Sequence, residues 1–201
     1  MYSKPSFKAI YRFLDHFNPV SFDCGTLCDA ICCLCSTESD ENTPSSDSDE
    51  NADYSMGLYL MPGEESVYTG NEDWISWGSI DAEEYEFPES WTGRVPFFQC
   101  NNAPHCPRKK RPLQCRTFPL APHIDEDGIL SVIYHRDPLP YECPLITNRE
   151  TYPLNGDFIK ATWLVWSHLI RDPLILDLVE MDSQIRILEG WPVDILYPSL
   201  D

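Results

Sequence analysis

Five of the twelve residues in CGTLCDAICCLC, positions 24 to 35, are cysteines, and this crowding limits what the chain can fold into. The sequence has nine cysteines in all, and the other four are Cys100, Cys106, Cys115 and Cys143. Disulfides cannot pair all of them, because nine is odd. Cys32 and Cys33 are neighbours with Cα atoms about 3.8 Å apart, below the usual disulfide range, so a bond between them would be strained.

The setting of these thiols follows from the rest of the sequence. The N-terminal stretch MYSKPSFKAIYRFLDHF interrupts its apolar residues with charges, and we expect no signal peptide. No segment approaches the ~20 apolar residues that span a bilayer. Both observations predict a cytoplasmic protein. In a reducing cytosol, clustered cysteines indicate metal or redox chemistry rather than structural disulfides.

Composition predicts a folded but acidic protein. The chain has 201 residues, of which 42% are hydrophobic, enough for one medium domain with a real core. Its formal charge is −19, from 33 Asp and Glu against 14 Lys and Arg. Such a surface repels phosphate backbones and anionic lipids, so we expect no nucleic-acid and no membrane partner. A protein partner and any oligomeric state are left open.

The expected fold class is α+β: a small, irregular, loop-rich domain with short strands, cysteine-ligated metal sites and C-terminal helices. Five regions are expected along the chain. An N-terminal amphipathic helix (1–23) is followed by a first cysteine cluster (24–35) and an acidic low-complexity linker or insertion (36–55). The main cysteine-cluster domain (56–150) comes next and ends in a helical segment of that same domain (151–201).

Several elements are predicted individually. Phe7, Ile10, Tyr11, Leu14 and Phe17 have helical spacing. Short strands are expected within 57–70, 74–87, 91–100 and 129–134, the last directly after the turn sequence DEDG. Helical periodicity from 157 to 190 is interrupted by a proline at 173, which predicts two helices or one kinked helix. The side chains expected to face the core there are Trp163, Trp166, Leu169 and Ile170.

Metal binding explains the cysteines best, because close spacing lowers the entropy of gathering several thiolates at one point. On a helix, Cys24, Cys28 and Cys32 would form one stripe. Cys35 continues that stripe, whereas Cys33 points about 100° away. Helical periodicity therefore favours Cys35 over Cys33 as a ligand.

The sequence also resembles a known family. CGTLCDAICC, then Cys100, Cys106, CRTFP at 115–119 and CPL from 143 look like the YkgJ-like cysteine-cluster proteins, a family described as zinc- or iron-chelating. The resemblance covers residues 24–35 and 57–150. It implies eight metal ligands: Cys24, Cys28, Cys32, Cys33, Cys100, Cys106, Cys115 and Cys143. The usual family pattern, C-x2-C-G-x-C-C, is tighter than the first cluster here. Between Cys33 and Cys35, we prefer Cys33, the ligand that the family resemblance implies, because the positions of side chains in an irregular segment do not follow helical periodicity.

Eight thiolates could make two four-cysteine sites, or one site with spare thiols. We expect zinc in a structural or accessory interaction module whose physiological role the sequence does not state. The alternative is an iron-sulfur cluster with a redox or enzymatic role, associated with a methylase as in some members resembling this family. Whether the chain is an enzyme stays open, with a non-enzymatic role favoured and no catalytic residue assigned.

Other side chains could support such a site. The basic run Arg108 to Arg111 and Arg116 could offset thiolate charge, although an exposed basic loop explains them equally well. His105 and His123 could replace or orient a ligand, but a histidine with an ordinary structural role is the simpler interpretation. His168, on the predicted Trp-rich helix, is expected to be structural. DEDG is expected to form a turn rather than an acid-base pair.

Overall fold

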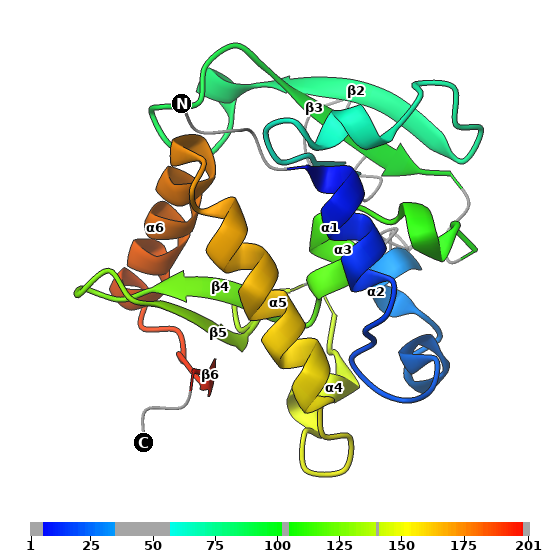
Figure 1. Cartoon of the computed structure of the whole chain (residues 1–201), viewed down its shortest axis with the longest axis vertical. Coiled ribbons are helices and arrows are strands. Elements are labelled where there is room, and N and C mark those ends of the chain that lie inside the picture. The colour runs from blue at the N-terminus through cyan, green and yellow to red at the C-terminus, as the bar shows by residue number, and fades with distance from the viewer. Residues whose placement is uncertain (1–5, 35–56, 102–104, 140, 199–201) are drawn as a thin grey trace, which may run out of the picture.

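The structure is a computed structural model that describes residues 6–34, 57–101, 105–139 and 141–198. Within these residues, two small antiparallel sheets of three strands each combine with several helices, which confirms the α+β prediction (Figure 1). Cys35 and the whole of the predicted acidic segment, 36–55, lie outside the described residues. None of the described helices has the length and apolar character needed to cross a membrane.

The first sheet has the strand order β1–β3–β2, with β1 at Gly57–Tyr59, β2 at Ile75–Asp81 and β3 at Arg94–Cys100. These strands are the aromatic-rich segments that alternate with Gly and Pro turns, as predicted. The sheet buries a small apolar cluster made of Leu60, Trp74, Ile75 and Phe98. Cys100 ends β3 opposite Ile75 of β2, so this cysteine lies on a strand and not on a loop.

The second sheet has the order β4–β5–β6, with β4 at Leu120–Ile124, β5 at Leu130–Tyr134 and β6 at Ile195–Tyr197. Every residue of β4 and β5 is buried, since α5 (Gly156–Leu169) packs on both strands and α6 (Pro173–Leu188) packs on β4. The DEDG turn joins them: Asp125 accepts hydrogen bonds from the N–H groups of Asp127 and Ile129, and Gly128 takes the left-handed φ of +76°. The predicted strand and turn are both confirmed.

Two helices follow, α5 at Gly156–Leu169 and α6 at Pro173–Leu188. The break between them falls at Pro173, because proline has no N–H to donate and is best placed in the first helical turn. The Asp172 side chain accepts a hydrogen bond from Leu174 N–H and caps the new helix. Trp166 and Leu169 are buried as predicted, whereas Trp163 and Ile170 are half-buried at the edge of the core.

The N-terminal helix α1 spans Phe7–Leu14 and buries four of the five predicted apolar residues, with Phe17 half-buried beyond its end. The remaining described elements are short. They are the 3-10 helices η1 (Cys24–Leu27), η2 (Glu64–Val67), η3 (Ala82–Glu84) and η4 (Arg108–Lys110), and the α-helices α2 (Ile31–Leu34), α3 (Leu113–Thr117) and α4 (Pro144–Thr147). Four of the eight described cysteines lie in these short elements: Cys24, Cys32, Cys33 and Cys115.

Candidate metal centre

The first cysteine segment is not one continuous helix. The 3-10 helix η1 ends before Cys28, and the next two residues, Asp29 and Ala30, have left-handed φ values of +50° and +55°. This conformation costs a non-glycine residue about 1 kcal/mol and cannot continue a right-handed helix. The predicted stripe of cysteines along one helical face is therefore wrong from Cys24 to Cys32, and it gives no reason to prefer Cys35.

Cys32 and Cys33 lie together on the single turn of α2 and share a hydrogen bond between their thiols. This bond raises the pKa of Cys32, and burial raises it further. The same bond lowers the pKa of Cys33, as do the charges of Arg111 and Arg108, while burial opposes them. Cys33 is thus the thiol of the pair that ionises more readily, which suits it to bind a metal as thiolate.

Four thiols lie close enough to interact electrostatically around the first cysteine segment, and we call them the first thiol group: Cys24, Cys28, Cys32 and Cys143. Cys143 precedes α4, far along the chain from the others. Burial raises the pKa of Cys143, and the negative charges of Cys28 and Cys24 raise it further. The fold therefore brings the last cysteine back to the first ones.

The other four described cysteines form what we call the second thiol group: Cys33, Cys100, Cys106 and Cys115. Cys115, on α3, keeps an exposed surface, yet protein atoms crowd its sulfur. This desolvation, followed by the charges of Cys33 and Cys106, raises the pKa of Cys115 to about 12. Cys106 and Cys100 both pack against the apolar cluster of the first sheet. The two thiol groups meet at the Cys32–Cys33 pair.

Arg111 stands beside the second thiol group. Its Nε donates a hydrogen bond to the sulfur of Cys106, 3.2 Å away. Desolvation lowers the pKa of Arg111, but this hydrogen bond and the charges of Cys106, Cys33 and Cys115 raise it overall. The guanidinium is therefore the positive charge best placed to stabilise several thiolates at once.

Two further arginines fasten the segments that carry the thiols. Arg108 of η4 forms an ion pair and hydrogen bond with Asp23, which directly precedes Cys24. Arg116 lies 4.1 Å over the ring of Tyr11 and donates to Asp15 at 2.8 Å and to the backbone oxygens of Lys109 and Arg111. These contacts tie α1 and the first cysteine segment to the loop between Cys106 and Cys115. Within the part of the chain that the structure describes, no hydrogen bond or ion pair joins Arg116 to a sulfur, and its contacts hold this loop.

A buried carboxyl group holds the start of α3, and the sequence did not single it out. Glu64 is fully buried and accepts hydrogen bonds from Tyr11 Oη at 2.5 Å, Leu113 N–H at 2.6 Å and Met61 N–H at 2.9 Å. Burial raises its pKa, and these three donors oppose that rise. Because neighbouring Glu65 is exposed and looks the same in sequence, no pattern could have distinguished the two.

Among the described residues, no three or more His, Cys, Asp or Glu side chains are grouped closely enough to hold a metal ion as they stand. The donor chemistry is of the kind that a thiophilic metal prefers, because the charges of Cys24 and Cys28 act on Cys143 and those of Cys33 and Cys106 act on Cys115. Of the two candidate histidines, His123 is buried on β4 among Arg186, Asp125 and Asp137, and His105 is exposed. His168 lies on α5, as expected, and is exposed.

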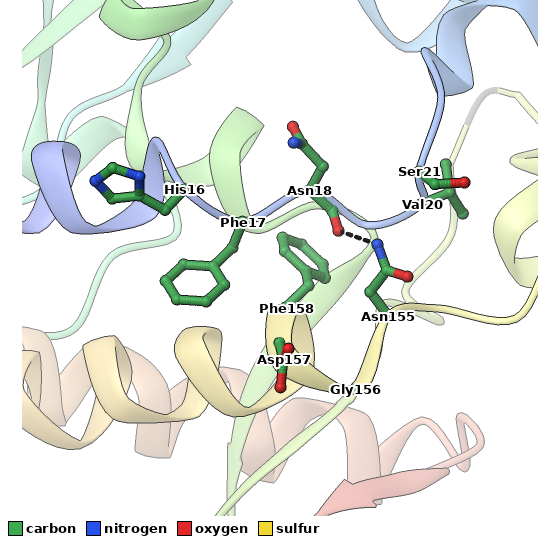
Figure 2. A pocket seen from close by; sticks show the side chains of 9 residues that line it. All are labelled: His16, Phe17, Asn18, Val20, Ser21, Asn155, Gly156, Asp157 and Phe158. Carbon is green, nitrogen blue, oxygen red and sulfur yellow. Dashed lines mark hydrogen bonds between the residues drawn. The ribbon is translucent and has the colours of Figure 1, made fainter.

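A separate cavity of about 480 Å³ lies between the segment after α1 and the start of α5. Figure 2 shows that His16, Asn18 and Asp157 project in different directions from its wall, while Asn155 is occupied by a hydrogen bond to the backbone oxygen of Asn18. Because its polar side chains do not converge, the cavity has no arrangement suited to catalysis.

Comparison of the chain with family models, with curated proteins and with solved structures finds no match. The resemblance to the YkgJ-like proteins therefore stays a prediction, and the fold and its thiols must carry the functional argument.

Proposed function

We propose that this chain is a zinc-binding protein that holds one ion in each thiol group. The observation that supports this best is the approach of Cys143 to Cys24 and Cys28, cysteines from distant parts of the chain. A fold that merely buried small apolar residues would not need to bring thiols from distant segments within electrostatic range of one another and of Arg108 and Arg111. Four thiolates per ion would match the closed tetrahedral coordination that structural zinc prefers.

Zinc binding would couple to ionisation of the thiols. Protonated thiols have no reason to lie at ligating distance, and metal binding draws them together as it displaces their protons. In the second group, Cys33 and Arg111 favour this step, the first by its lowered pKa and the second by its positive charge. A closed site with four protein ligands leaves no position for a substrate, so the proposed role is to brace the fold of an interaction module.

The test is elemental analysis of anaerobically purified protein, combined with its visible absorption spectrum. We expect about two zinc ions per chain and no colour. Iron with matching sulfide and a brown colour would replace zinc by an iron-sulfur cluster on the same ligands, with redox chemistry as its role. Protein without bound metal and with free thiols throughout would contradict the proposal.

Single substitutions sharpen the test. Cys143→Ser and Cys115→Ser should each remove about one zinc ion, because each belongs to a different four-cysteine site. Cys35→Ser is the matched control, since neither thiol group includes that residue, and it should retain both ions. Loss of all metal from Cys143→Ser alone, with the fold intact by circular dichroism, would contradict two independent sites.

A further inference from the structure

A second surface stands apart from the thiols, between α1 and α5, which run in roughly opposite directions (Figure 1). A groove of about 280 Å³ lies between them, lined chiefly by apolar atoms of Ala9, Phe13, Leu164 and Val165. Phe13 and Leu164 are 37% and 51% exposed, although both are large hydrophobic residues. Two such side chains around one groove form an apolar surface that a partner could cover.

Positive charge borders this groove on the outer side of α1. Lys8 and Arg12 of α1 are exposed, and α1 contacts η4, which contributes exposed Lys109 and Lys110. The backbone of η4 is held there, because Tyr68 donates to the backbone oxygen of Lys110 and its Oη lies 3.1 Å from the Oη of Tyr11 in α1. These four cations therefore lie on α1 and on an element that contacts it.

These cations are not neutralised locally. Within the described part of the chain, no ion pair involves Lys8, Arg12, Lys109 or Lys110. The 3-10 helix η2 also contacts α1 and contributes one exposed acid, Glu65. On α5, Lys160 is exposed about one turn before Leu164, and Asp157 is an exposed acid in the first turn of the helix. The exposed cations named here outnumber these acids, although the whole chain has 33 acidic and 14 basic residues.

We infer that the α1–α5 groove is a docking site for an acidic amphipathic helix of a partner protein. Apolar side chains of that helix would cover Phe13 and Leu164, and its carboxylates would face the cations of α1, η4 and α5. This inference does not depend on metal binding. Two antiparallel helices with a groove between them offer a third helix the packing it needs to bury one apolar stripe.

The same charges favour a short acidic helix over a long polyanion. At physiological salt the Debye length is about 8 Å, so a docked helix experiences the local cations more than the net charge of −19. A nucleic acid or an anionic membrane extends beyond the groove and meets the acidic remainder of the surface. Phosphates would also leave Phe13 and Leu164 without apolar contacts.

The test uses the full chain and three synthetic peptides of about 18 residues, each long enough for five helical turns. The first has a leucine stripe with glutamates elsewhere, the second replaces glutamate by lysine, and the third replaces leucine by serine. Fluorescence anisotropy should show binding of the first peptide alone, weakening as salt is raised. Amide chemical shifts should change on α1 and α5. Binding of the lysine peptide as tight as that of the glutamate peptide, or shifts confined to other elements, would overturn the proposal.

Variants separate the apolar and charged parts of the surface. Leu164→Ser and the double variant Lys8→Gln, Arg12→Gln should each weaken binding about tenfold, since each removes contacts worth about 1.4 kcal/mol. The control is Leu188→Ser at the end of α6, a residue that is 82% exposed and not in the groove. Tighter binding to an oligonucleotide or to anionic vesicles than to the acidic peptide, with no effect of Leu164→Ser, would reassign the surface and overturn the proposal.

Discussion

The carboxyl group of Glu64 accepts a hydrogen bond from the backbone N–H of Leu113 at 2.6 Å, deep in the core and next to the helix that carries Cys115. One buried side chain thereby connects η2, α1 and α3, because it also accepts from Tyr11 and Met61. The placement of Cys115 depends on a residue that is neither a cysteine nor adjacent to one in sequence.

Glu64→Ala should destabilise the protein by about 3 kcal/mol, because three buried donors would lose their acceptor. The measurement is the free energy of unfolding from urea denaturation. Glu65→Ala is the matched control, since Glu65 is exposed, and it should change stability by less than about 0.5 kcal/mol. Equal effects of the two substitutions would show that the buried network contributes little.

Substitution of Arg186 should lower the stability of the protein about as much as substitution of Glu64, for a different reason. Its side chain is buried and donates two hydrogen bonds to Asp137, at 2.7 and 2.9 Å, and one to the backbone oxygen of Pro122 at 3.0 Å. Arg186→Met should cost about 3 kcal/mol, because it leaves the Asp137 carboxylate without its partner. The double variant with Asp137→Asn should recover part of this loss, and urea denaturation of both variants tests the coupling. A double variant no more stable than Arg186→Met would argue against it.

Asp182 predicts a pH-dependent effect on stability. Burial raises its pKa from 3.8 to about 6, although Arg186 lowers it. The folded protein therefore binds this proton more tightly than the unfolded chain, and the resulting stability is lost as pH rises from about 4 to about 6. Asp182→Asn mimics the protonated form. It should raise the melting temperature at pH 7.5 and leave it unchanged at pH 4, where the native residue is already neutral. An equal rise at both values would point to a cause other than ionisation.

The division of the thiols predicts different outcomes for adjacent cysteines. Cys33→Ser combined with Cys115→Ser should retain about one zinc ion, because both residues belong to the second thiol group. Cys32→Ser combined with Cys115→Ser should retain none, since each group then loses a ligand. The measurement is the zinc content per chain of the two folded double variants, obtained by elemental analysis. Equal zinc content would contradict the assignment of the neighbours to separate sites.

Arg111 should affect only one of the two proposed sites. Arg111→Gln removes the charge beside Cys106, so the second thiol group should release zinc to a chelator more readily. Release of the first ion should not change. Chelator competition followed with a zinc-sensitive dye would show one faster phase in the variant. A variant with both phases unchanged would exclude a role for Arg111 in metal retention.

Much of the fold could be predicted from local pattern. The helix α1, the strand β5, the turn after β4 and the break before α6 all follow from the spacing of apolar residues and from the chemistry of Asp, Gly and Pro. The break in the first cysteine segment could not, because Asp29 tolerates a left-handed φ but does not require one, and Ala30, which also has a left-handed φ, is a strong helix former. The helical stripe of cysteines was therefore wrong.

The sequence by itself determined the donors: nine cysteines, too crowded and too many for disulfides alone, in a chain of strongly acidic composition. Only the tertiary structure decided which of them meet. Cys143 lies within electrostatic range of Cys28, and Cys115 within electrostatic range of Cys33, although these residues come from distant segments. The spacing of residues along the sequence does not predict either pair. The same is true of the α1–α5 groove, since each helix looks ordinary in sequence. Spacing along a chain controls local structure, but proximity between remote residues depends on how the whole core packs.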